Sequence, residues 1–430
     1  MEKRSLQFDV LVVGGGPAGL MSAFAAAAKG AKVALVEKNQ RCGRKLLMSG
    51  GGRCNLAQQI EDAVQLARNY HGGRFLISAF KSFGVADMRA FLAARGVETK
   101  VEENGRVFPI SDRGEDVLDA LYRSCRAEGV VFLENEEILE ICQEKEENLL
   151  ESEKTFSQKG KIGKVITDKR IIYARNFVLA TGGKSYAHTG SSGQGYVWAK
   201  KMGHSLREPQ PALAPIRVKE NWLGEAQGVS ARKVVLTARQ KGKKIAVEKG
   251  DLMVAHFGLS GPVALNISSK INLALQKGAV ELAVDFVPFS SLEQLDETFR
   301  QIFAKNPPKT ILSCLKGLVS PKLLPVLCKL SGMDGTKNAG NVQKDERRKL
   351  AANFKDLRFQ VAGICGFERA MVTSGGVVTA QIDSKTMRSK IISNLYFAGE
   401  IIDVDGPTGG YNLQMCWSSG FVAGSEAAVV

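Results

Sequence analysis

The stretch FDVLVVGGGPAGLMSAFAAAAKGAKVALVEK, residues 8–38, decides the fold class of this chain. Its apolar residues 8–13 predict a strand that runs directly into the glycine-rich turn GGGPAG at 14–19. A helical pattern follows as far as Gly30, and residues 32–36 predict a second strand. Strand, glycine turn, helix and strand in this order predict a Rossmann-type α/β domain that binds a dinucleotide.

The glycines of this turn have separate roles. Gly14 permits the tight turn, Gly16 lets the backbone approach a pyrophosphate, and Gly19 lets helix and strand pack closely. The helix N-terminus offers free N–H groups and a positive dipole end to the phosphates. Pro17 and Ala18 begin the helix. Proline is tolerated there because the N–H group that it lacks would have no hydrogen-bond partner within the helix. A glycine turn without a ligand is the alternative, and the flanking strands and helix argue against it.

Glu37 ends the second strand, 18 residues after Gly19, and Lys38 follows it. An acid at about this distance accepts hydrogen bonds from the ribose hydroxyls of a dinucleotide. The same acid would repel a 2′-phosphate, so this nucleotide-binding site favours FAD or NAD over NADP. We expect both Glu37 and Lys38 to contact the cofactor.

A second segment, LYFAGEIIDVDGPTGGYNLQ at residues 395–414, predicts the flavin half of the site. Residues 394–398 predict a strand that ends at Gly399 and Glu400, and Glu400 is placed to accept hydrogen bonds from ribityl hydroxyls. A helix is expected from the glycines at 409–410 to about residue 423. Its N–H groups would face the flavin N1/C2-carbonyl edge and stabilise the reduced flavin. Further expected contacts are Asp403, Gly410, Tyr411, Asn412 and Leu413.

The two segments together identify FAD as the expected cofactor. A capped helix with glycines used only for packing is the alternative for the C-terminal segment. Asp403 and Asp405 are candidate acids near the flavin ring, and a solvated loop is an equal interpretation of Asp405.

Length and composition describe an ordinary globular protein with an unusual charge. The 430 residues predict two or three domains, and 44% of them are hydrophobic. Eight cysteines without a CxxC pair are expected to be buried free thiols in a reducing compartment, and no metal site is expected. Neither a signal peptide nor a membrane span is expected, which favours a cytoplasmic enzyme.

The domain order is expected to be discontinuous. The FAD-binding domain is predicted at 1–204 and 358–430, a β-rich insert at 205–290 and a helical subdomain at 291–357. Short strand patterns mark the insert, and prolines break the helical patterns that follow it.

Several longer motifs resemble one family. They are GRKLLMSGGGRCNL (43–56), TGGKSYAHTGSSGQGYVWAKKMGH (181–204), HFGLSGP (256–262), VTSGGV (372–377) and AGEIIDVDGPTGGYNLQMCWSSGFVAG (398–424). Over nearly its whole length the chain resembles the BaiN-like (YhiN-like) family of NAD(P)/FAD-dependent oxidoreductases, related to the fumarate reductase and glutathione reductase flavoproteins. This resemblance implies a Rossmann-type FAD domain with an inserted β-barrel-like domain and a helical portion. Small departures occur at Ala187, His188 and Pro407.

The resemblance also implies further cofactor contacts. Arg44 and Lys45 would lie beside the FAD phosphates or ribose, and the strand end at Thr181 and Gly182 would close the site. The backbone near Ile138 would face the adenine, by analogy with related flavoproteins. The residues implied to line the cofactor are Ser49, Gly51, Gly52, Arg53 and Asn55.

The chemistry implied by the resemblance is hydride transfer through flavin N5 to or from a carbon–carbon bond of a small organic substrate. No second strand–GxGxxG–helix pattern is present, so NADH or NADPH is expected to bind transiently as the electron donor. The candidates for a polarising cation or proton donor are His256, Arg53 and Tyr186, with His188 also considered. A structural salt bridge for Arg53, a satisfied structural histidine at His256 and a packed thiol at Cys54 are the alternatives.

Three other functions stay open. A flavin oxidase would use molecular oxygen, and a non-enzymatic flavin-binding module would not be reduced by nicotinamide. A flavin-dependent RNA-modifying or nucleic-acid-associated protein is suggested by the net charge of +15. The basic runs at 232–244 and 344–349 carry no aromatic stacking pattern, so a nucleic-acid partner is not favoured.

Overall fold

The computed structural model describes residues 4–144 and 160–429. The chain forms two compact units, each described by itself below. The first, here the Rossmann unit, comprises Met1–Pro211 and Met371–Val430. The second, here the barrel unit, comprises Ala212–Ala370. The boundary expected between 357 and 358 falls at the start of strand β16 (Leu357–Ile364), which belongs to the barrel because it pairs with strands on both sides.

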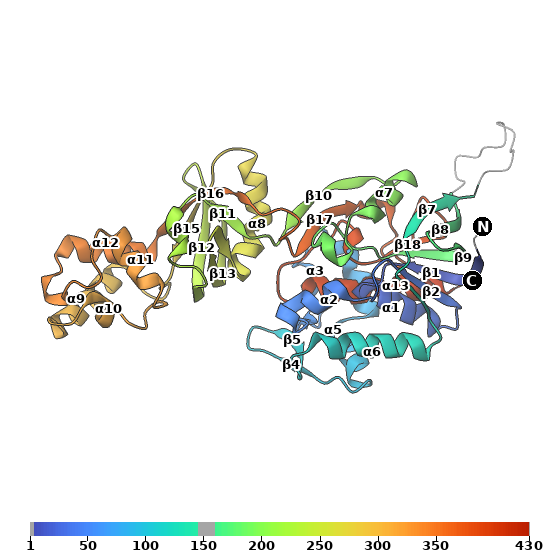
Figure 1. Cartoon of the computed structure of the whole chain (residues 1–430), viewed down its shortest axis with the longest axis horizontal. Helices are drawn as coiled ribbons and strands as arrows, with labels where there is room; N and C mark the ends of the chain where they lie inside the picture. Colours follow the sequence, from blue (N-terminus) through green and yellow to red (C-terminus); the bar gives the residue numbers. More distant parts are fainter. Residues whose placement is uncertain (1–3, 145–159, 430) are drawn as a thin grey trace. The chain divides into compact units, whose positions relative to one another are not determined.

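The Rossmann unit is built on a mainly parallel sheet, as the sequence predicts (Figure 1). Its strand order is β6-β2-β1-β9-β8-β7, and β18 pairs with β9. The central residues Val10, Leu11 and Val12 are completely buried, which explains their continuous apolar run. The strands are β1 (Ser5–Val13), β2 (Val33–Glu37), β6 (Val131–Glu134), β7 (Ile138–Gln143), β8 (Ile162–Thr167), β9 (Ile171–Leu179) and β18 (Leu395–Phe397).

Helices α1 (Pro17–Ala27) and α13 (Tyr411–Ala427) pack closely against each other. Two glycines of α13 permit this approach. A Cβ at Gly420 would lie 2.5 Å from the Ala18 carbonyl oxygen, and one at Gly424 would lie 2.1 Å from that of Ser22. The first and last segments of the chain therefore form one core, and α13 extends four residues beyond the expected end near 423.

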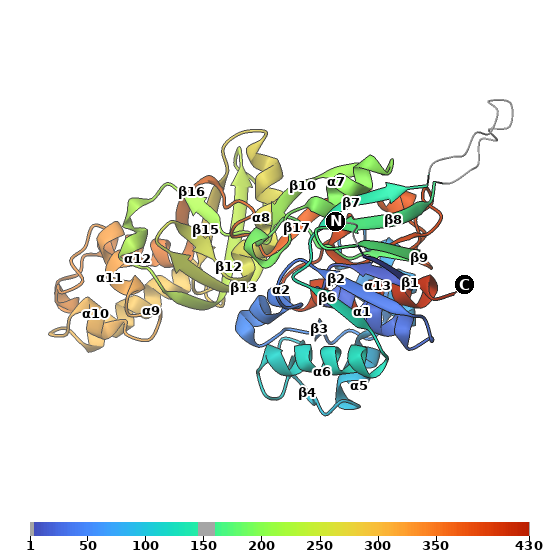
Figure 2. The same ribbon diagram turned by 45° about the vertical axis from the view of Figure 1, so that its right-hand side comes forward.

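The remaining elements of the Rossmann unit surround this core (Figure 2). Residues 85–97 and 115–128 have helical sequence patterns, and helices α5 and α6 form there, with α5 ending at Ala93. The helices are α2 (Arg44–Met48), α3 (Ala63–Ala67), α4 (Ile77–Ser82), α5 (Val85–Ala93), α6 (Gly114–Ala127) and α7 (Gln194–Lys201). The smaller strands are β3 (Ala57–Gln58), β4 (Thr99–Val101), β5 (Arg106–Pro109), β10 (Leu206–Ala212) and β17 (Val372–Val377).

The barrel unit contains the predicted β-barrel. Six strands close in the order β11-β14-β13-β12-β15-β16. The strands preceding β16 are β11 (Ile216–Val218), β12 (Ser230–Gln240), β13 (Lys243–Ala255), β14 (Gly258–Ser260) and β15 (Glu281–Asp285). The helices are α8 (Pro262–Leu275), α9 (Leu292–Lys305), α10 (Ile311–Cys314), α11 (Leu323–Leu330) and α12 (Lys344–Lys355).

The helical segment shares one hydrophobic core with the barrel. Phe299 of α9 and Phe354 of α12 are fully buried in the same cluster as Leu236 and Leu282 of the barrel strands. The insert at 205–290 was predicted to be β-rich, and helix α8 within it was not predicted, although Pro262 at its first turn was a sequence signal for a helix start.

The cysteines are free in the part of the chain that the structure describes, in agreement with the sequence. Burial raises the pKa of the Cys54 thiol to about 12, which fits a packed rather than a reactive thiol. Over residues 4–144 and 160–429, no helix has the length and apolar character required to cross a bilayer. The same residues hold no group of three or more His, Cys, Asp or Glu side chains arranged for a metal ion.

The α1–α13 crossing predicts a strong effect of a single methyl group. Gly424→Ala should lower the free energy of unfolding by about 1–3 kcal/mol, because its Cβ meets backbone atoms that cannot move aside. Gly224→Ala is the matched control, since a Cβ there meets no described atom within 4 Å. Urea unfolding followed by circular dichroism measures both, and equal midpoints for the two variants would contradict the packing argument.

Candidate functional site

The glycine turn has the geometry that the sequence predicts. Gly14 has φ +101°, and a Cβ there would lie 2.6 Å from the Ala180 carbonyl oxygen. A Cβ at Gly19 would lie 1.8 Å from the Gly14 carbonyl oxygen. Gly16 differs, because its Cβ would meet no described atom within 4 Å. Packing therefore explains Gly14 and Gly19, whereas Gly16 leaves an open approach to the first turn of α1, where Pro17 and Ala18 lie.

Glu37 lies beside this turn, and its side chain is buried. Its Oε2 accepts a hydrogen bond from the Gly15 N–H at 2.8 Å. Its Oε1 accepts from the backbone and side-chain nitrogens of Asn39 at 2.8 and 2.7 Å. A carboxylate offers about four acceptor positions. Three are used here, so one is left for a hydroxyl group such as that of a ribose.

The two predicted halves of the site come together within the Rossmann unit. The Ala180 N–H donates to Val13 at the end of β1, and the Ala398 N–H donates to Leu179 at the end of β9. A Cβ at Gly399 would lie 2.7 Å from the Ala18 Cβ, which places the C-terminal segment against the first turn of α1. The strand ends, including Thr181 and Gly182, therefore meet at one edge of the sheet.

Glu400 is the centre of a polar network at this edge. Its Oε2 lies 2.7 Å from the Lys45 Nζ, and its Oε1 accepts from the Thr373 N–H at 2.8 Å and the Ser185 hydroxyl at 2.9 Å. The Lys45 Nζ also donates to Ser185 at 2.8 Å. Lys45 thus contacts the acid of the flavin half. Ser185 and Thr373 were not singled out from the sequence, although both stand in motifs quoted for the family resemblance, at 181–204 and 372–377.

The segment that follows the glycine run of residues 50–52 lies against the start of α13 through Asn55 and Ala57. Gly51 and Gly52 have φ +69° and +91°. A Cβ at Gly410 would lie 2.4 Å from the Ala57 carbonyl carbon, so only glycine fits there. The Asn55 amide, oriented to satisfy its hydrogen bonds, accepts from the Gly410 N–H and donates to the Ala57 and Val107 carbonyls. Asn55 therefore fixes the α13 N-terminus.

Several predicted contacts have their polar groups occupied by protein. The Arg53 guanidinium pairs with Glu102 and Asp112 and lies over the Phe108 ring. This arrangement matches the structural salt bridge considered for Arg53. The others are Arg44 with Asn39, Lys38 with Ser192, the Ser49 hydroxyl with the Leu46 carbonyl, and the Asn412 side chain with the backbone of Gly406 and Pro407.

For three further predicted residues, the structure shows backbone or packing contacts within the protein. Ile138 begins β7, two residues after Glu136, whose N–H donates to the Glu37 carbonyl. The Tyr411 carbonyl accepts from the Tyr70 hydroxyl at 2.6 Å, and Leu413 is partly buried against the core.

The proposed catalytic residues do not all share one unit. Tyr186 lies in the Rossmann unit with φ +53°, and its ring contacts that of His188 edge-on. Burial raises the pKa of the Tyr186 hydroxyl. His256 lies in the barrel unit, in the turn between β13 and β14, where its ring is exposed and contacts Phe257.

Asp403 is buried and Asp405 is largely buried, and both lie near His71 and Arg207, which sequence patterns also missed. His71 stands in the sequence NYHGG, and nothing in that sequence marks it. Only the fold, through a backbone bridge between His71 and Asp405, brings them together.

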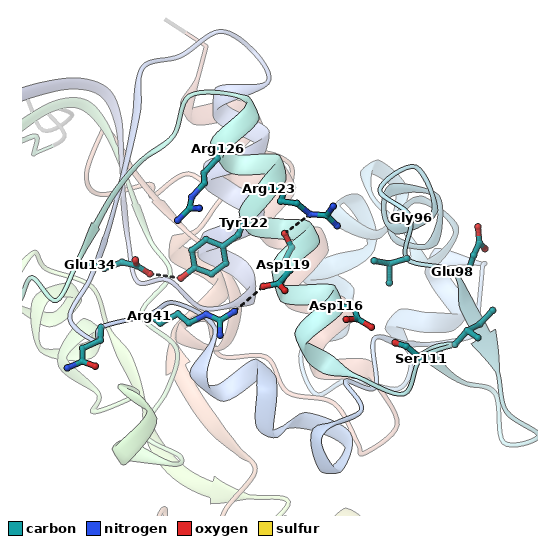
Figure 3. A pocket seen from close by; sticks show the side chains of 13 residues that line it. Arg41, Gly96, Glu98, Ser111, Asp116, Asp119, Tyr122, Arg123, Arg126 and Glu134 are labelled. Carbon is teal, nitrogen blue, oxygen red and sulfur yellow. Dashed lines mark hydrogen bonds and ion pairs between the residues drawn. The ribbon is translucent and has the colours of Figure 1, made fainter.

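A hollow of about 1040 Å³ lies elsewhere, beside α6 (Figure 3). Several of its polar side chains already have protein partners. Arg41 pairs with Glu115 and Asp119, and the Tyr122 hydroxyl donates to Glu134. None of the predicted site residues lines this hollow, so its size does not outweigh the geometry of the glycine turn.

Characterised proteins resemble the chain over nearly its full length. A 3-dehydro-bile acid delta(4,6)-reductase of Clostridium scindens is 32% identical, covering 97% of this chain and 98% of the relative. A ribosomal RNA dihydrouridine synthase of Escherichia coli is 30% identical, covering 98% of both proteins. Its counterpart in Haemophilus influenzae is 31% identical, covering 96% of both.

Solved structures share the fold at lower identity. A 3-ketosteroid delta1-dehydrogenase from Sterolibacterium denitrificans aligns with a TM-score of 0.56 at 13% identity, covering 98% of this chain and 99% of that one. A 3-ketosteroid-delta4-(5alpha)-dehydrogenase from Rhodococcus jostii aligns with a TM-score of 0.53 at 15% identity, covering both chains completely.

The family model described as the HI0933-like protein Rossmann domain matches residues 8–426. The chain therefore belongs to the HI0933-like Rossmann family, the BaiN-like (YhiN-like) family of flavoprotein oxidoreductases that its motifs resemble.

Proposed function

We propose that this protein is an FAD-dependent reductase that takes electrons from NADH or NADPH and saturates a carbon–carbon double bond conjugated to a carbonyl group. One observation carries the proposal: Glu37, the open first turn of α1 and the Gly399–Glu400 segment converge in one unit. These are the groups that a dinucleotide, its ribose and a ribityl chain require.

The residues present fit FAD. The N-terminus of α1 has no side-chain cap, so its free N–H groups and dipole favour a pyrophosphate. Glu37 keeps one acceptor position for the ribose, and Glu400 would face the ribityl hydroxyls. The N-terminus of α13, also without a side-chain cap, would favour negative charge at the ring. When bound, FAD supplies hydride transfer through N5.

The relatives support the reaction class. The names delta(4,6)-reductase and dihydrouridine synthase both describe the addition of hydrogen to a carbon–carbon double bond. In a 3-dehydro bile acid and in uridine, that bond is conjugated to a carbonyl group. Conjugation makes the bond electron-poor, so that it accepts hydride at one carbon and a proton at the other. We extend this reaction class to the present chain.

The first prediction concerns the cofactor and its donor. The purified protein should hold FAD with a visible flavin spectrum, and anaerobic NADH or NADPH should bleach it. Exposure to air would then distinguish an oxidase from a reductase. The reduced flavin of an oxidase is reoxidised rapidly by oxygen, whereas that of a reductase is reoxidised faster by 2-cyclohexen-1-one. A protein that takes up no flavin after reconstitution would refute the proposal.

A second prediction tests the glycine turn. Gly16→Ala should fold normally, because the added methyl group meets no described protein atom. It should weaken FAD binding by at least about tenfold, or ~1.4 kcal/mol, because the methyl group stands where the pyrophosphate approaches. Fluorescence titration of the apoprotein with FAD measures this, and Gly224→Ala again serves as the control. An unchanged affinity for FAD would show that the pyrophosphate does not bind at the first turn of α1.

A uracil base in RNA is a second candidate substrate, favoured by the distribution of charge. Residues 212–370 contain 25 lysines and arginines against 14 aspartates and glutamates, a net charge of +11 out of the total of +15. Lys241, Lys243 and Lys244 are exposed at the turn between β12 and β13. Such a concentration of positive charge suits a phosphate backbone.

A matched pair of triple variants tests this candidate. Replacing Lys241, Lys243 and Lys244 by glutamine should weaken binding to unmodified ribosomal RNA transcripts. The dependence of log K on log salt should flatten by about 0.7–0.9 for each phosphate that the variant no longer neutralises. Replacing the exposed Lys305, Lys309 and Lys316 removes the same charge from the same unit as a control. Equal effects would indicate non-specific attraction, and no dihydrouridine in the product would exclude RNA as the substrate.

A further inference from the structure

A cluster of titratable groups lies within the Rossmann unit, outside the Glu400 network. Asp405 Oδ1 accepts a hydrogen bond from the Ser374 hydroxyl at 2.7 Å and lies 3.9 Å from the His71 Nδ1. The His71 backbone N–H also donates to the Asp405 carbonyl at 2.9 Å, which holds the two residues side by side. The Asp405 side chain is 15% exposed and that of His71 is 48% exposed. The pair therefore joins a largely buried carboxyl to the solvent.

Arg207 determines which nitrogen of His71 carries the proton. Its Nη1 lies 2.9 Å from the His71 Nε2. A guanidinium can only donate, so Nε2 accepts, and a neutral His71 holds its proton on Nδ1. This is the nitrogen that faces Asp405. The tautomer follows from the hydrogen-bond partners.

Asp403 adds an unsatisfied acceptor to the cluster. Its Oδ2 lies 3.3 Å from the Arg207 Nε. Its Oδ1 is buried and has no hydrogen-bond partner among the described residues, which is a costly arrangement for a carboxylate oxygen. A purely structural ion pair would not require this second oxygen to be left open. The unsatisfied Asp403 Oδ1 therefore indicates a hydrogen-bond donor that the described residues do not supply.

The position of the cluster in the chain connects it to the flavin site. Asp403 and Asp405 lie between Glu400 and Gly410, the two positions assigned above to the ribityl chain and the ring. A Cβ at Gly406 would lie 2.9 Å from both the Tyr70 ring and the Tyr411 Cβ, so the loop is held against the start of α13. The acids therefore lie on a loop that is anchored between the Glu400 network and the start of α13.

The surroundings of Asp405 favour its protonated form. Burial is the main cause that raises the pKa of the Asp405 carboxyl, and the nearby charges of Asp403 and Glu400 raise it further. The Ser374 hydrogen bond and His71 act in the opposite direction. Arg207 faces the cluster through Asp403, and Lys45 neutralises Glu400. The net result is an acid that keeps its proton more readily than an exposed aspartate.

We infer that Asp405 delivers the proton that completes the reduction and that its carboxylate then recovers a proton from solvent, with the Nδ1–H of His71 facing it. The inference rests on the proposed reductase function. As hydride forms a C–H bond at one alkene carbon, the π electrons move to the other carbon. That carbon takes the proton as the Asp405 O–H bond breaks. NADH or NADPH is oxidised, and the Asp405 carboxylate, whose side chain is 15% exposed, then recovers a proton from solvent.

The titration of Asp405 is tested on the apoprotein. A raised pKa in the folded state means that ionisation costs stability as the pH rises above the ordinary value of about 3.9. The Asp405→Asn variant has no carboxyl to ionise at this position. Its melting temperature should therefore rise relative to that of the wild type as the pH increases from about 4 to about 8. Parallel melting profiles would overturn the inference. The exposed Glu61→Gln is the control variant.

The chemistry is tested on the FAD-loaded protein in two half-reactions. NADH or NADPH should reduce the flavin of wild type and Asp405→Asn at similar rates, and FAD affinity should be unchanged. Reoxidation of the photoreduced flavin by 2-cyclohexen-1-one or 4-androstene-3,17-dione should be about 10²–10⁴-fold slower in Asp405→Asn. His71→Gln should cause a smaller loss that imidazole buffer does not restore, because His71 faces Asp405 without passing a proton to it.

The outcomes separate the two hypotheses. If the wild type reoxidises with these enones and Asp405→Asn does so equally fast, the assignment of Asp405 as the proton donor is wrong and the reductase function stands. If the wild-type flavin passes electrons to neither enone nor to uridine-containing RNA, the proposed function fails, and the role of Asp405 fails with it. Loss of FAD binding in Asp405→Asn would instead assign Asp405 to cofactor retention and overturn its role as an acid.

Discussion

The close crossing of α1 and α13 is the constraint on which the Rossmann unit depends. Gly420 and Gly424 let the two helices approach until backbone meets backbone, at Ala18 and Ser22. Dispersion contacts at such short range are individually weak and collectively large. The crossing joins segments separated by almost 400 residues of sequence. It thereby sets the two helix N-termini, each without a side-chain cap, within the same unit.

Electrostatics then organise the edge of the sheet beside these helices. Glu400 collects donors from Lys45, Ser185 and Thr373, which come from three separate parts of the chain. A partly buried carboxylate needs such partners, because an unpaired charge there would cost several kcal/mol by order of magnitude. The same need explains why Asp403, with one oxygen satisfied and one open, is conspicuous.

The barrel unit has a different character from the Rossmann unit. It carries most of the net charge, and its helices α9–α12 share a core with the barrel. The strand pattern predicted a β-rich insert and the family resemblance implied its barrel form, but α8 was overlooked because short apolar runs fit a strand or a buried helix equally well. The β16 boundary was also difficult to predict. Strand β16 is part of the barrel because it pairs with β11 and β15. Pairing between strands that are far apart in the sequence leaves no local sequence signal.

Local chemistry determined much of this protein from the sequence alone. The turn at Gly14–Gly19, the acid at Glu37 and the glycine helix start at Gly410 each depend on backbone conformation and short-range spacing, which the sequence records directly. Tertiary structure alone decided the partners of Glu400, the ion pairs of Arg53 and the meeting of His71 with Asp405. Those contacts join residues 27 to 355 positions apart. Their energies depend on distance and burial, which exist only after the chain has folded.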